Sequence, residues 1–503
     1  MTPSQEELAR RLALPQRHRL LQGYPMLPLM RAALDPAVRE LRWGQRHPDG
    51  SVHVDAFGPD SPEKAAHEEE AFLQLDATRP LLVGVLPHSQ CNPRVEGCGF
   101  CTFPHDRYNK GLLQLTAEGV SDQIYDLFAA RPELRKRRVE GVYFGGATAN
   151  LAPARTLSRI ANSLAQHLDL SAAEVTLEGV PSLFRSLLRG PFEALLDMPA
   201  RHRRISMGVQ TFDEAMLARM GRAHFGGKKE VARVVDKAHR HGLTASGDFL
   251  LNLPSEPRRR MVEDVREAAA MGLDQICVYH LVLSPGHGTP WGQDPSVLAE
   301  LPSVEQAFSN WLAVREELLG LGYVQSTLTN FERAEVHATD RRFVYETASF
   351  TPERYDALGF GPLSISTFTD PSRRRAVKFA RGKSLRSWAW GQQDLYFAYD
   401  EEDLRLLHLT RTLCRLGVSL DTYQALFGAA LTDHFGEVVE AVVDANLATL
   451  DSDLRLTPRG MFYADSVAGL FAWRRGESLR EKGAGRTTRD LLDDRVRFND
   501  FMG

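Results

Sequence analysis

Three of the five cysteines in this 503-residue chain lie close together, between residues 88 and 103. Their spacing is Cys91-x6-Cys98-x2-Cys101, and Gly99 lets the backbone turn tightly within the shorter interval. Two thiolates at that spacing can converge on one metal centre, and a third can reach it from the far end of a short loop. Structural zinc sites and electron-transfer clusters usually have four protein ligands, whereas three thiolates on a cubane cluster leave one iron open. The cysteines therefore favour an iron–sulfur cluster that does chemistry on a small molecule.

Two other interpretations of these cysteines stay open from spacing alone. They could be ordinary thiols, or they could form a zinc site that His88 or His105 completes. Five cysteines with three in one cluster are typical of a reducing compartment and a metal or catalytic role, not of a disulfide framework. Cys277 and Cys414 stand alone in apolar surroundings, and we interpret them as small buried side chains without a role.

The composition is that of an ordinary globular protein, with 43% hydrophobic and 25% charged residues. A formal net charge of −4 gives no overall attraction to nucleic acid or to an anionic membrane, although residues 201–204 and 258–260 are local basic runs. The N-terminus has no cationic region followed by an apolar run, and no later stretch approaches about eighteen uncharged apolar residues. We therefore expect a cytoplasmic protein with no membrane and no nucleic-acid partner.

The elements that must hold the cysteines form a regular alternation of strands and helices from Pro80 onward. Short apolar runs predict strands at 81–86, 139–144, 174–177, 204–209, 244–251 and 275–283. Helical periodicity predicts helices at 115–131, 153–168, 182–196, within 213–241, at 257–271 and at 303–320. Six such units predict an α/β fold with a parallel sheet and helices outside it, whose chemistry lies on the loops that leave the strand C-termini.

Polar residues and glycines gather at those strand ends. In strand order they are the cysteine loop, Gly145–Thr148, Glu178, Gln210, Asp248 and Tyr279–His280. Each has an ordinary explanation, because glycines end strands and carboxylates cap helices or pair with arginines. Together at one edge of one sheet they favour a site for a polar cofactor. Glycines would allow close approach, carboxylates would bind hydroxyl or ammonium groups, and Arg222 would bind a carboxylate through a bidentate fork.

The rest of the chain divides into four expected regions. Residues 1–78 are an extension wrapped on the main body, and 79–330 are the core of strand and helix units. Residues 331–400 are a connecting region whose glycine loop, Gly359–Pro362, could line a pocket or only turn the chain. Residues 401–503 are a small helical or winged-helix-like domain with a charged tail.

Taken together, these motifs resemble the radical S-adenosylmethionine (SAM) superfamily, and within it the branch of oxygen-independent coproporphyrinogen dehydrogenase, with its haem-chaperone and class C methyltransferase relatives. The resemblance extends over roughly residues 80–470. Beyond the cysteines, the segments that carry it are Val142–Thr148, Glu174–Glu178, Arg204–Phe212, Met220–His224, Asp248–Pro254, Gly359–Ser366 and Leu416–Gly428.

The resemblance implies a partial (β/α)6 TIM-like barrel with a [4Fe–4S] cluster on Cys91, Cys98 and Cys101. SAM would chelate the open iron, and one electron would cleave it to a 5′-deoxyadenosyl radical that abstracts a hydrogen atom. The implied partners are a small-molecule substrate and an electron donor such as flavodoxin or ferredoxin. No catalytic triad or acid/base pair is expected. The implied cofactor-binding residues are Phe100, Gly145, Gly146, Glu178, Arg222 and Asp248, with Thr148 and Gln210 near a second SAM or the substrate.

The chain departs from the branch in its cysteine loop, which has six residues between Cys91 and Cys98 where the branch usually has three. Doubling a loop adds only about 0.6 kcal/mol of closure entropy, so a site of this kind tolerates the longer loop.

Four substitutions also separate the chain from the branch. Val85 and Pro87 stand where a Tyr and a His are usual, with His88 one place off. Phe103 replaces a further cysteine, and Ala147 replaces a third glycine. These changes argue against porphyrinogen decarboxylation and leave radical SAM chemistry intact.

Four functions therefore stay open. They are tetrapyrrole oxidation, methyl transfer or carbon–carbon bond formation with two SAM molecules, haem carriage on the same scaffold, and a zinc-stabilised barrel without turnover. The missing tyrosine and fourth cysteine put methyl transfer level with oxidation or slightly ahead. His224 and His280 are the candidate haem ligands.

Overall fold

The structure of the chain is a computed structural model. It describes residues 43–46, 52–53, 78–91, 98–101, 103, 106–185, 190–281, 283, 289–370, 375–381, 385, 388, 395–399 and 401–482. Most of the expected extension at 1–78 and the expected charged tail beyond residue 482 lie outside these residues.

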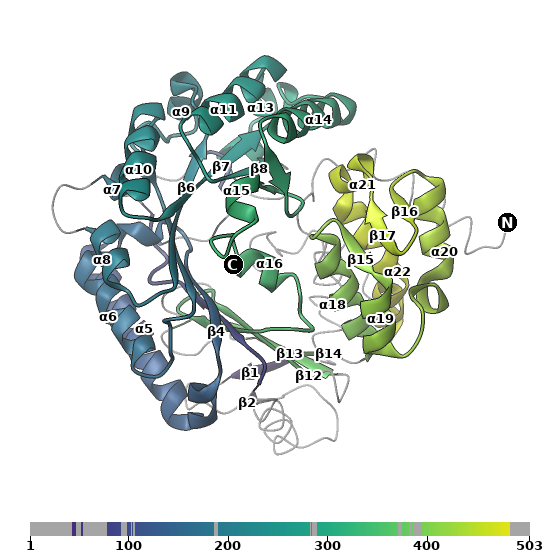
Figure 1. The fold of residues 1–503 in the computed structure, drawn as a ribbon, viewed down its shortest axis with the longest axis horizontal. Helices are drawn as coiled ribbons and strands as arrows, with labels where there is room; N and C mark the ends of the chain where they lie inside the picture. The colour runs from purple at the N-terminus through teal and green to yellow at the C-terminus, as the bar shows by residue number, and fades with distance from the viewer. Residues whose placement is uncertain are drawn as a thin grey trace.

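Six parallel strands form the centre of the molecule, and neighbours in the sheet follow one another along the chain. They are β3 (Leu81–Val85), β4 (Val139–Phe144), β5 (Glu174–Gly179), β6 (His202–Gln210), β7 (Thr244–Leu251) and β8 (Gln275–His280). Figure 1 shows these strands curving into part of a barrel with helices on the outside. The predicted α/β fold, a partial barrel of six units, is confirmed.

The outer helices follow the strands in the predicted rhythm. They are α5 (Lys110–Ala130), α6 (Ala154–Ala165), α7 (Pro181–Phe184), α8 (Pro191–Asp197), α9 (Glu214–Arg219), α10 (Lys228–Arg240) and α11 (Arg258–Ala270), with short 3₁₀ helices η1 (Pro132–Lys136) and η2 (Ala149–Leu151). The single helix predicted at 182–196 is wrong, because Gly190 and Pro191 start a new helix and Pro cannot continue a preceding one. The first helix begins at Lys110 and not near 115, because the Asn109 side chain caps it by accepting from the Leu112 backbone N–H.

Further strands extend the sheet at both edges, to fourteen strands in the described part of the chain. Beyond α12 (Pro290–Gln293), α13 (Pro295–Ala299) and α14 (Val304–Gly320), two antiparallel strands add to β8. These are β9 (Tyr323–Gln325) and β10 (Asn330–Arg333). At the other edge β11 (Asp356–Phe360) pairs parallel with β3, and an antiparallel run follows it. That run contains β12 (Ile365–Asp370), β13 (Arg375–Ala380), β14 (Leu395–Tyr399), β1 (Trp43–Arg46) and β2 (Val52–His53).

Two short helices lie between these edges, α15 (Ala334–His337) and α16 (Tyr345–Ser349). Figure 1 shows α16 within the curve of the sheet. The Tyr345 side chain packs against Gly84 and Gly141, where a larger residue would meet it. The described part of 331–400, a region that the sequence predicted to connect the two domains, thus places α16 inside the barrel and adds strands to the edges of the sheet.

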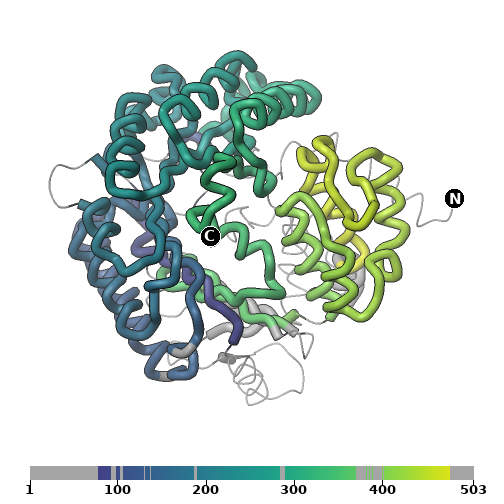
Figure 2. The backbone as a smooth tube through the Cα atoms, in the orientation of Figure 1, coloured from purple at the N-terminus to yellow at the C-terminus, as the bar shows by residue number. Residues whose placement is uncertain are grey.

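The last eight elements form a lobe beside the barrel, drawn in yellow-green in Figure 2. They are α18 (Glu401–Leu413), β15 (Gly417–Ser419), α19 (Leu420–Phe427), α20 (Leu431–Asp444), β16 (Ala448–Leu450), β17 (Asp453–Leu456), α21 (Pro458–Phe462) and α22 (Ala464–Lys482). The predicted small, mostly helical domain is confirmed, with a three-stranded antiparallel sheet inside it. An aromatic contact joins it to the barrel, since the ring centroids of Phe462 and His280 lie 5.1 Å apart.

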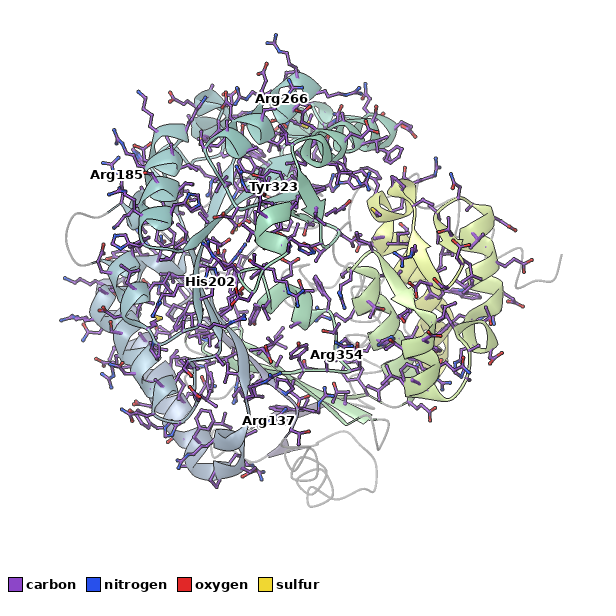
Figure 3. All side chains as sticks on the ribbon, in the orientation of Figure 1. Arg137, Arg185, His202, Arg266, Tyr323 and Arg354 are labelled. Carbon is purple, nitrogen blue, oxygen red and sulfur yellow. The ribbon has the colours of Figure 1, made fainter. Side chains whose placement is uncertain are left out.

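A buried cluster of charges fixes β11 to the base of the barrel. The Asp356 carboxylate accepts from Arg79 Nε at 3.2 Å and from an η nitrogen of Arg137, labelled in Figure 3. The same carboxylate accepts from the Thr369 backbone N–H at 2.9 Å. This arrangement closes the base of the sheet without an unpaired charge on the carboxylate.

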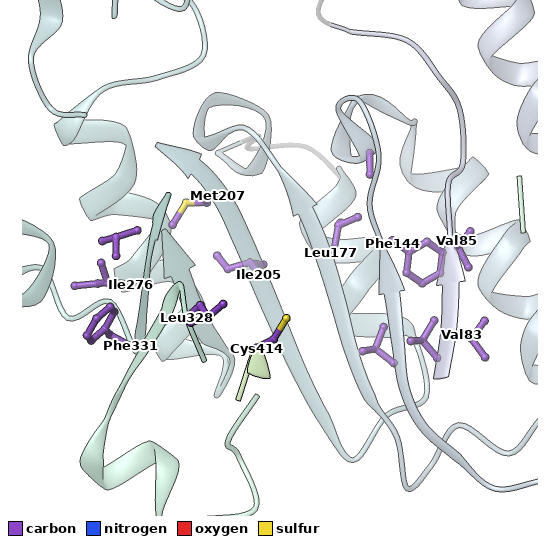
Figure 4. Close-up of a cluster of buried hydrophobic side chains, with 14 of the residues drawn as sticks. Val83, Val85, Phe144, Leu177, Ile205, Met207, Ile276, Leu328, Phe331 and Cys414 are labelled. Carbon is purple, nitrogen blue, oxygen red and sulfur yellow. The ribbon is translucent and has the colours of Figure 1, made fainter. Parts of the chain in front are cut away.

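Alternation along each strand decides which side chains face the barrel interior. On β6, Ile205 and Met207 are buried in the apolar cluster of Figure 4, beneath the helices. Because successive side chains point to opposite faces, Ser206 and Gly208 face the interior. The hydroxyl of Ser206 indeed accepts from Ser246 on β7 at 3.0 Å. The barrel interior is therefore polar, while its outer face provides the core.

Candidate cofactor site

The cysteine loop leaves β3 at the C-terminal mouth of the barrel and is fastened to other loops there. The Cys101 backbone N–H donates to the Cys98 carbonyl at 3.0 Å, which forms the tight turn expected between them. Gly99 donates to the Met220 carbonyl at 3.2 Å and accepts from the Trp291 backbone N–H at 2.9 Å. A Cβ at Gly99 would collide with the Trp291 indole, so only glycine fits. The shorter half of the loop is thus held from two sides.

The three thiols share one space at the mouth. Burial, together with the nearby charge of Cys98, raises the pKa of the Cys91 thiol to about 11, against a hydrogen bond from the Thr148 hydroxyl. Burial, then the charges of Cys98 and Cys91, raise the pKa of Cys101 to about 12. Thiols this reluctant to ionise become thiolates when a metal centre binds them. Cys91 and Cys101 therefore fit a group that brings strong positive charge, as iron does.

The side chains that could complete a zinc site are placed as follows. Among the described residues, no three His, Cys, Asp or Glu side chains are grouped so that they could hold a metal ion. His88 is buried, and its Nδ1 accepts from the Gln90 backbone N–H at 3.1 Å. His105 lies outside the described residues.

Arg222 reaches the same space from the turn after α9. Its Nη1 donates to Cys98 Sγ at 3.2 Å, and its Nη2 donates to the Gly208 carbonyl at 2.7 Å. The guanidinium also lies over the Phe225 ring, 4.4 Å from its centroid. Its Nε is buried and has no hydrogen-bond partner in the described part of the protein. A buried donor without a partner costs about 1–3 kcal/mol, so Nε is where a ligand's acceptor fits.

Two carboxyl groups face each other from β5 and β7. Burial and the nearby charge of Asp248 raise the pKa of Glu178 to about 8, although Tyr143 hydrogen-bonds this carboxyl. Burial raises the pKa of Asp248 to about 6, against a hydrogen bond from Cys277 and the charges of Arg204 and Arg222. A cation between these carboxyls would relieve their repulsion and stabilise their charged forms. The site therefore offers a guanidinium to an anion and two carboxyls to a cation.

Two glycines keep room beside these charges. A Cβ at Gly145 would come within 2.9 Å of Glu178 Oε2 and 2.7 Å of Tyr143 Cε1. Gly146 has φ of 110°, a conformation that other residues rarely adopt. The predicted need for small residues after the second strand thus has a steric cause.

Thr148 and Gln210 lie at the same mouth. Thr148 is buried and hydrogen-bonds Cys91. Gln210 closes β6 with φ of 73°, at a register shift opposite Asp248 and Phe249. Such strained backbone is concentrated at functional sites. Phe100 differs, since its ring packs near Trp291 with centroids 6.1 Å apart in a small apolar cluster.

Sequence reasoning missed residues that support this site from below. Tyr143 hydrogen-bonds Glu178, and its inward direction follows from the outward Val142 and Phe144. Cys277 was predicted to be an apolar side chain without a role, and it is buried as expected. However, its single S–H can donate either to Asn330 Oδ1 or to Asp248, because alternation along β8 turns the thiol to the polar interior. Cys414 is buried in the C-terminal lobe.

The two candidate haem ligands are not brought together. His224 is exposed. His280 is half-buried beside Phe462 of the C-terminal lobe and Trp311 of α14, and burial lowers its pKa to about 3.

Comparison with known families gives two matches along the chain. Residues 85–268 match the family described as "Radical SAM superfamily", and residues 402–463 match the "HemN C-terminal domain". The first match contains all three clustered cysteines and the strand ends from Gly145 to Asp248. None of the helices in the described part of the chain has the length and apolar character that crossing a bilayer requires.

Individual relatives agree with these matches. "Radical S-adenosyl methionine domain-containing protein 1, mitochondrial" of Mus musculus is 27% identical over 463 residues, which cover 86% of this chain and 94% of that protein. "Heme chaperone HemW" of Escherichia coli K12 is 28% identical over 311 residues, covering 58% and 75%. The solved structure of coproporphyrinogen III oxidase (HemN) from Escherichia coli has the same fold, with a TM-score of 0.65 at 17% identity, over 80% of this chain and 93% of that one.

Proposed function

This chain belongs to the radical SAM superfamily, in the branch of coproporphyrinogen dehydrogenase and the haem chaperones, and on that premise we propose that it is a radical SAM enzyme. Cys91, Cys98 and Cys101 would bind a [4Fe–4S] cluster, and the adjoining mouth of the barrel would bind SAM. The cluster supplies the electron that cleaves SAM to a 5′-deoxyadenosyl radical.

One observation carries this proposal. Three half-buried thiols, an arginine with an unpartnered Nε and two carboxyls with raised pKa values meet at the C-terminal mouth of one barrel. An amino acid moiety has the complementary charges, since its carboxylate suits Arg222 and its ammonium suits the carboxyls. SAM carries both groups and a cationic sulfonium.

The residues of the chain would bind, orient and shield the cofactor. Arg222 would hold a carboxylate through its free Nε. Glu178 and Asp248 would hold cationic or hydroxyl groups, and Gly145 and Gly146 would let the cofactor lie close to the backbone. Tyr143 would fix the Glu178 carboxyl in place. The apolar contact of Phe100 with Trp291 would keep water from the mouth.

The substrate class divides the proposal into two variants, tetrapyrrole oxidation and methyl transfer or carbon–carbon bond formation. Thr148 and Gln210 would sit near the substrate or a second SAM. Phe103 is in place of a further cysteine, and this favours the second variant slightly. A cytoplasmic location, a small-molecule substrate and an electron donor such as flavodoxin or ferredoxin belong to the same proposal.

Haem carriage is the second candidate, because several relatives are named haem chaperones, including those of Escherichia coli and Lactococcus lactis. Such a role would keep the cluster site and add haem binding. His224 is the more exposed histidine of the two candidates, because His280 is half-buried against Phe462.

Anaerobic reconstitution with iron and sulfide, followed by SAM and dithionite, tests the proposal. We expect 5′-deoxyadenosine by chromatography, and also S-adenosylhomocysteine if a methyl group is transferred. Haem binding without either product would favour the chaperone. A loaded protein that releases neither product and binds no haem would contradict both functions.

A further inference from the structure

The contact between Arg222 and Cys98 carries an inference that rests on the proposed function and goes beyond it. We propose that Arg222 is a positioning residue that raises the reduction potential of the cluster by hydrogen-bonding the Cys98 sulfur. The contact is direct, with 3.2 Å between Nη1 and Sγ. It needs no bound cofactor, because the protein alone holds the guanidinium there.

Three contacts fix the position of Arg222. Nη2 donates to the Gly208 carbonyl at 2.7 Å, and the Phe225 ring lies below the guanidinium. The Arg222 backbone N–H donates to the Leu217 carbonyl at 2.7 Å, next to Gly221 with φ of 77°. The side chain is only 7% exposed. A guanidinium held this firmly keeps its direction toward the sulfur whether or not a ligand is bound.

The guanidinium nitrogens of Arg222 have different partners, and this separates contact with the cluster ligand from ligand binding. Nη1 donates to the cysteine sulfur and Nη2 to a backbone carbonyl, while the buried Nε has no partner in the described part of the chain. A residue whose sole task was to bind a ligand carboxylate would present a free pair of nitrogens to it. In this protein one of the outer nitrogens is already committed to sulfur.

The effect on potential follows from charge. Reduction adds a negative charge to the cluster, and a nearby cation or a donor on a coordinating sulfur stabilises the reduced form. The charge of Arg222 also acts on Cys91 and Cys101, where it favours the thiolate. The site is buried, so solvent screens this interaction weakly. Removing the guanidinium should therefore lower the potential.

The test is a redox titration of the reconstituted full chain without SAM. The EPR signal of the reduced cluster monitors this titration. For Arg222→Gln we expect at least a tenfold smaller equilibrium constant for reduction, which is a fall of about 59 mV for one electron. Arg222→Lys keeps the charge but has a single nitrogen to share between the sulfur and the Gly208 carbonyl, so its potential should fall by a smaller amount. Arg219→Gln is the matched control, because Arg219 is on the preceding helix and pairs with Glu300 on the surface.

The outcomes separate this inference from the proposed function. A wild-type chain that binds no iron and sulfide would contradict the proposed function itself. A loaded Arg222→Gln protein with the potential of Arg219→Gln would overturn the inference alone. If Arg222→Gln does not load, Arg222→Lys decides, and the wild-type potential in that variant would overturn the inference.

Discussion

The two ends of the barrel differ in whether their buried charged groups have partners within the chain. At the base, Asp356 is fully buried and bonds two arginines, Arg79 and Arg137, and the Thr369 backbone. The remaining donors of Arg79 reach the carbonyls of residues 352, 353 and 355. At the mouth, Arg222 keeps a buried Nε without a partner, and Glu178 and Asp248 repel each other.

The difference shows which end is complete without a ligand. Buried charges are normally paired, because an uncompensated one is strongly destabilising. The base satisfies this rule within the chain, so its charges serve the fold. The mouth leaves an anion-binding and a cation-binding group unsatisfied, and a zwitterionic ligand beside a metal cluster would satisfy both. Substitutions at the two ends and changes of pH should reveal this contrast, with the largest effect at the base.

Removing the Asp356 carboxylate at the base should mainly lower the stability of the fold. In Asp356→Asn the two buried arginines lose their carboxylate, and we expect the free energy of unfolding to fall by about 3–5 kcal/mol. Guanidinium denaturation followed by circular dichroism measures it. The control Asp236→Asn removes an exposed partner of Arg240 and should change nothing measurable. Equal stability of the two variants would contradict the structural role of the base.

At the mouth, the unpaired carboxyls should make the affinity for SAM depend on pH. Burial and mutual repulsion hold the pKa of Glu178 at about 8 and burial holds that of Asp248 at about 6, so both carboxyls keep protons well above the ordinary range. A bound cation favours their ionised forms, and binding then releases protons. The affinity for SAM should rise with pH between 6 and 8, by up to about tenfold per unit for one proton.

The same shifts fix the sign of the stability change. A raised pKa in the folded state means that the folded protein binds protons more tightly than the unfolded chain. The cofactor-free protein should therefore lose stability as the pH rises from about 4.5 toward 8.

Equilibrium dialysis measures how the affinity for SAM depends on pH. The affinity should change less with pH for Glu178→Gln than for wild type or the exposed control Glu316→Gln. An unchanged slope in Glu178→Gln would show that this carboxyl does not sense the ligand.

The smallest effect should come from steric crowding at Gly145, without any change of charge. In Gly145→Ala the added methyl would crowd Glu178 and Tyr143, so we expect SAM binding to weaken severalfold while the fold persists. Calorimetric titration of the reconstituted variant measures this. Gly320→Ala is the control, because its Cβ meets nothing within 4 Å. A Gly145→Ala protein that binds SAM like this control would place the ligand elsewhere.

The sequence was informative where local pattern and chemistry coincide. The period of the apolar residues predicted the bounds of β4 and β7, and the polar strand ends predicted which residues would gather at the mouth. The inward direction of Tyr143 and Cys277 also follows from strand alternation. The cause of the raised pKa values was not available, because it depends on how deeply Glu178 and Asp248 are buried together.

Long-range pairing could not be predicted from periodicity. β11 pairs with β3 although about 270 residues separate them, and only the structure shows that Asp356 lies between Arg79 and Arg137. α16 is too short for a helical period to reveal it, yet it fills the barrel through Tyr345. The contact of Arg222 with Cys98 likewise joins two loops far apart in the chain.

Iron and sulfide content is the most direct test of the central claim that the cysteine trio holds a cluster at the mouth. The wild-type chain, reconstituted without oxygen and desalted, should hold close to four irons and four sulfides per chain, as a [4Fe–4S] cluster requires. Simultaneous replacement of Cys91, Cys98 and Cys101 by Ala should abolish both, while Cys414→Ala should keep them. Full iron and sulfide in the triple variant, or stoichiometric zinc in the wild type, would contradict the account.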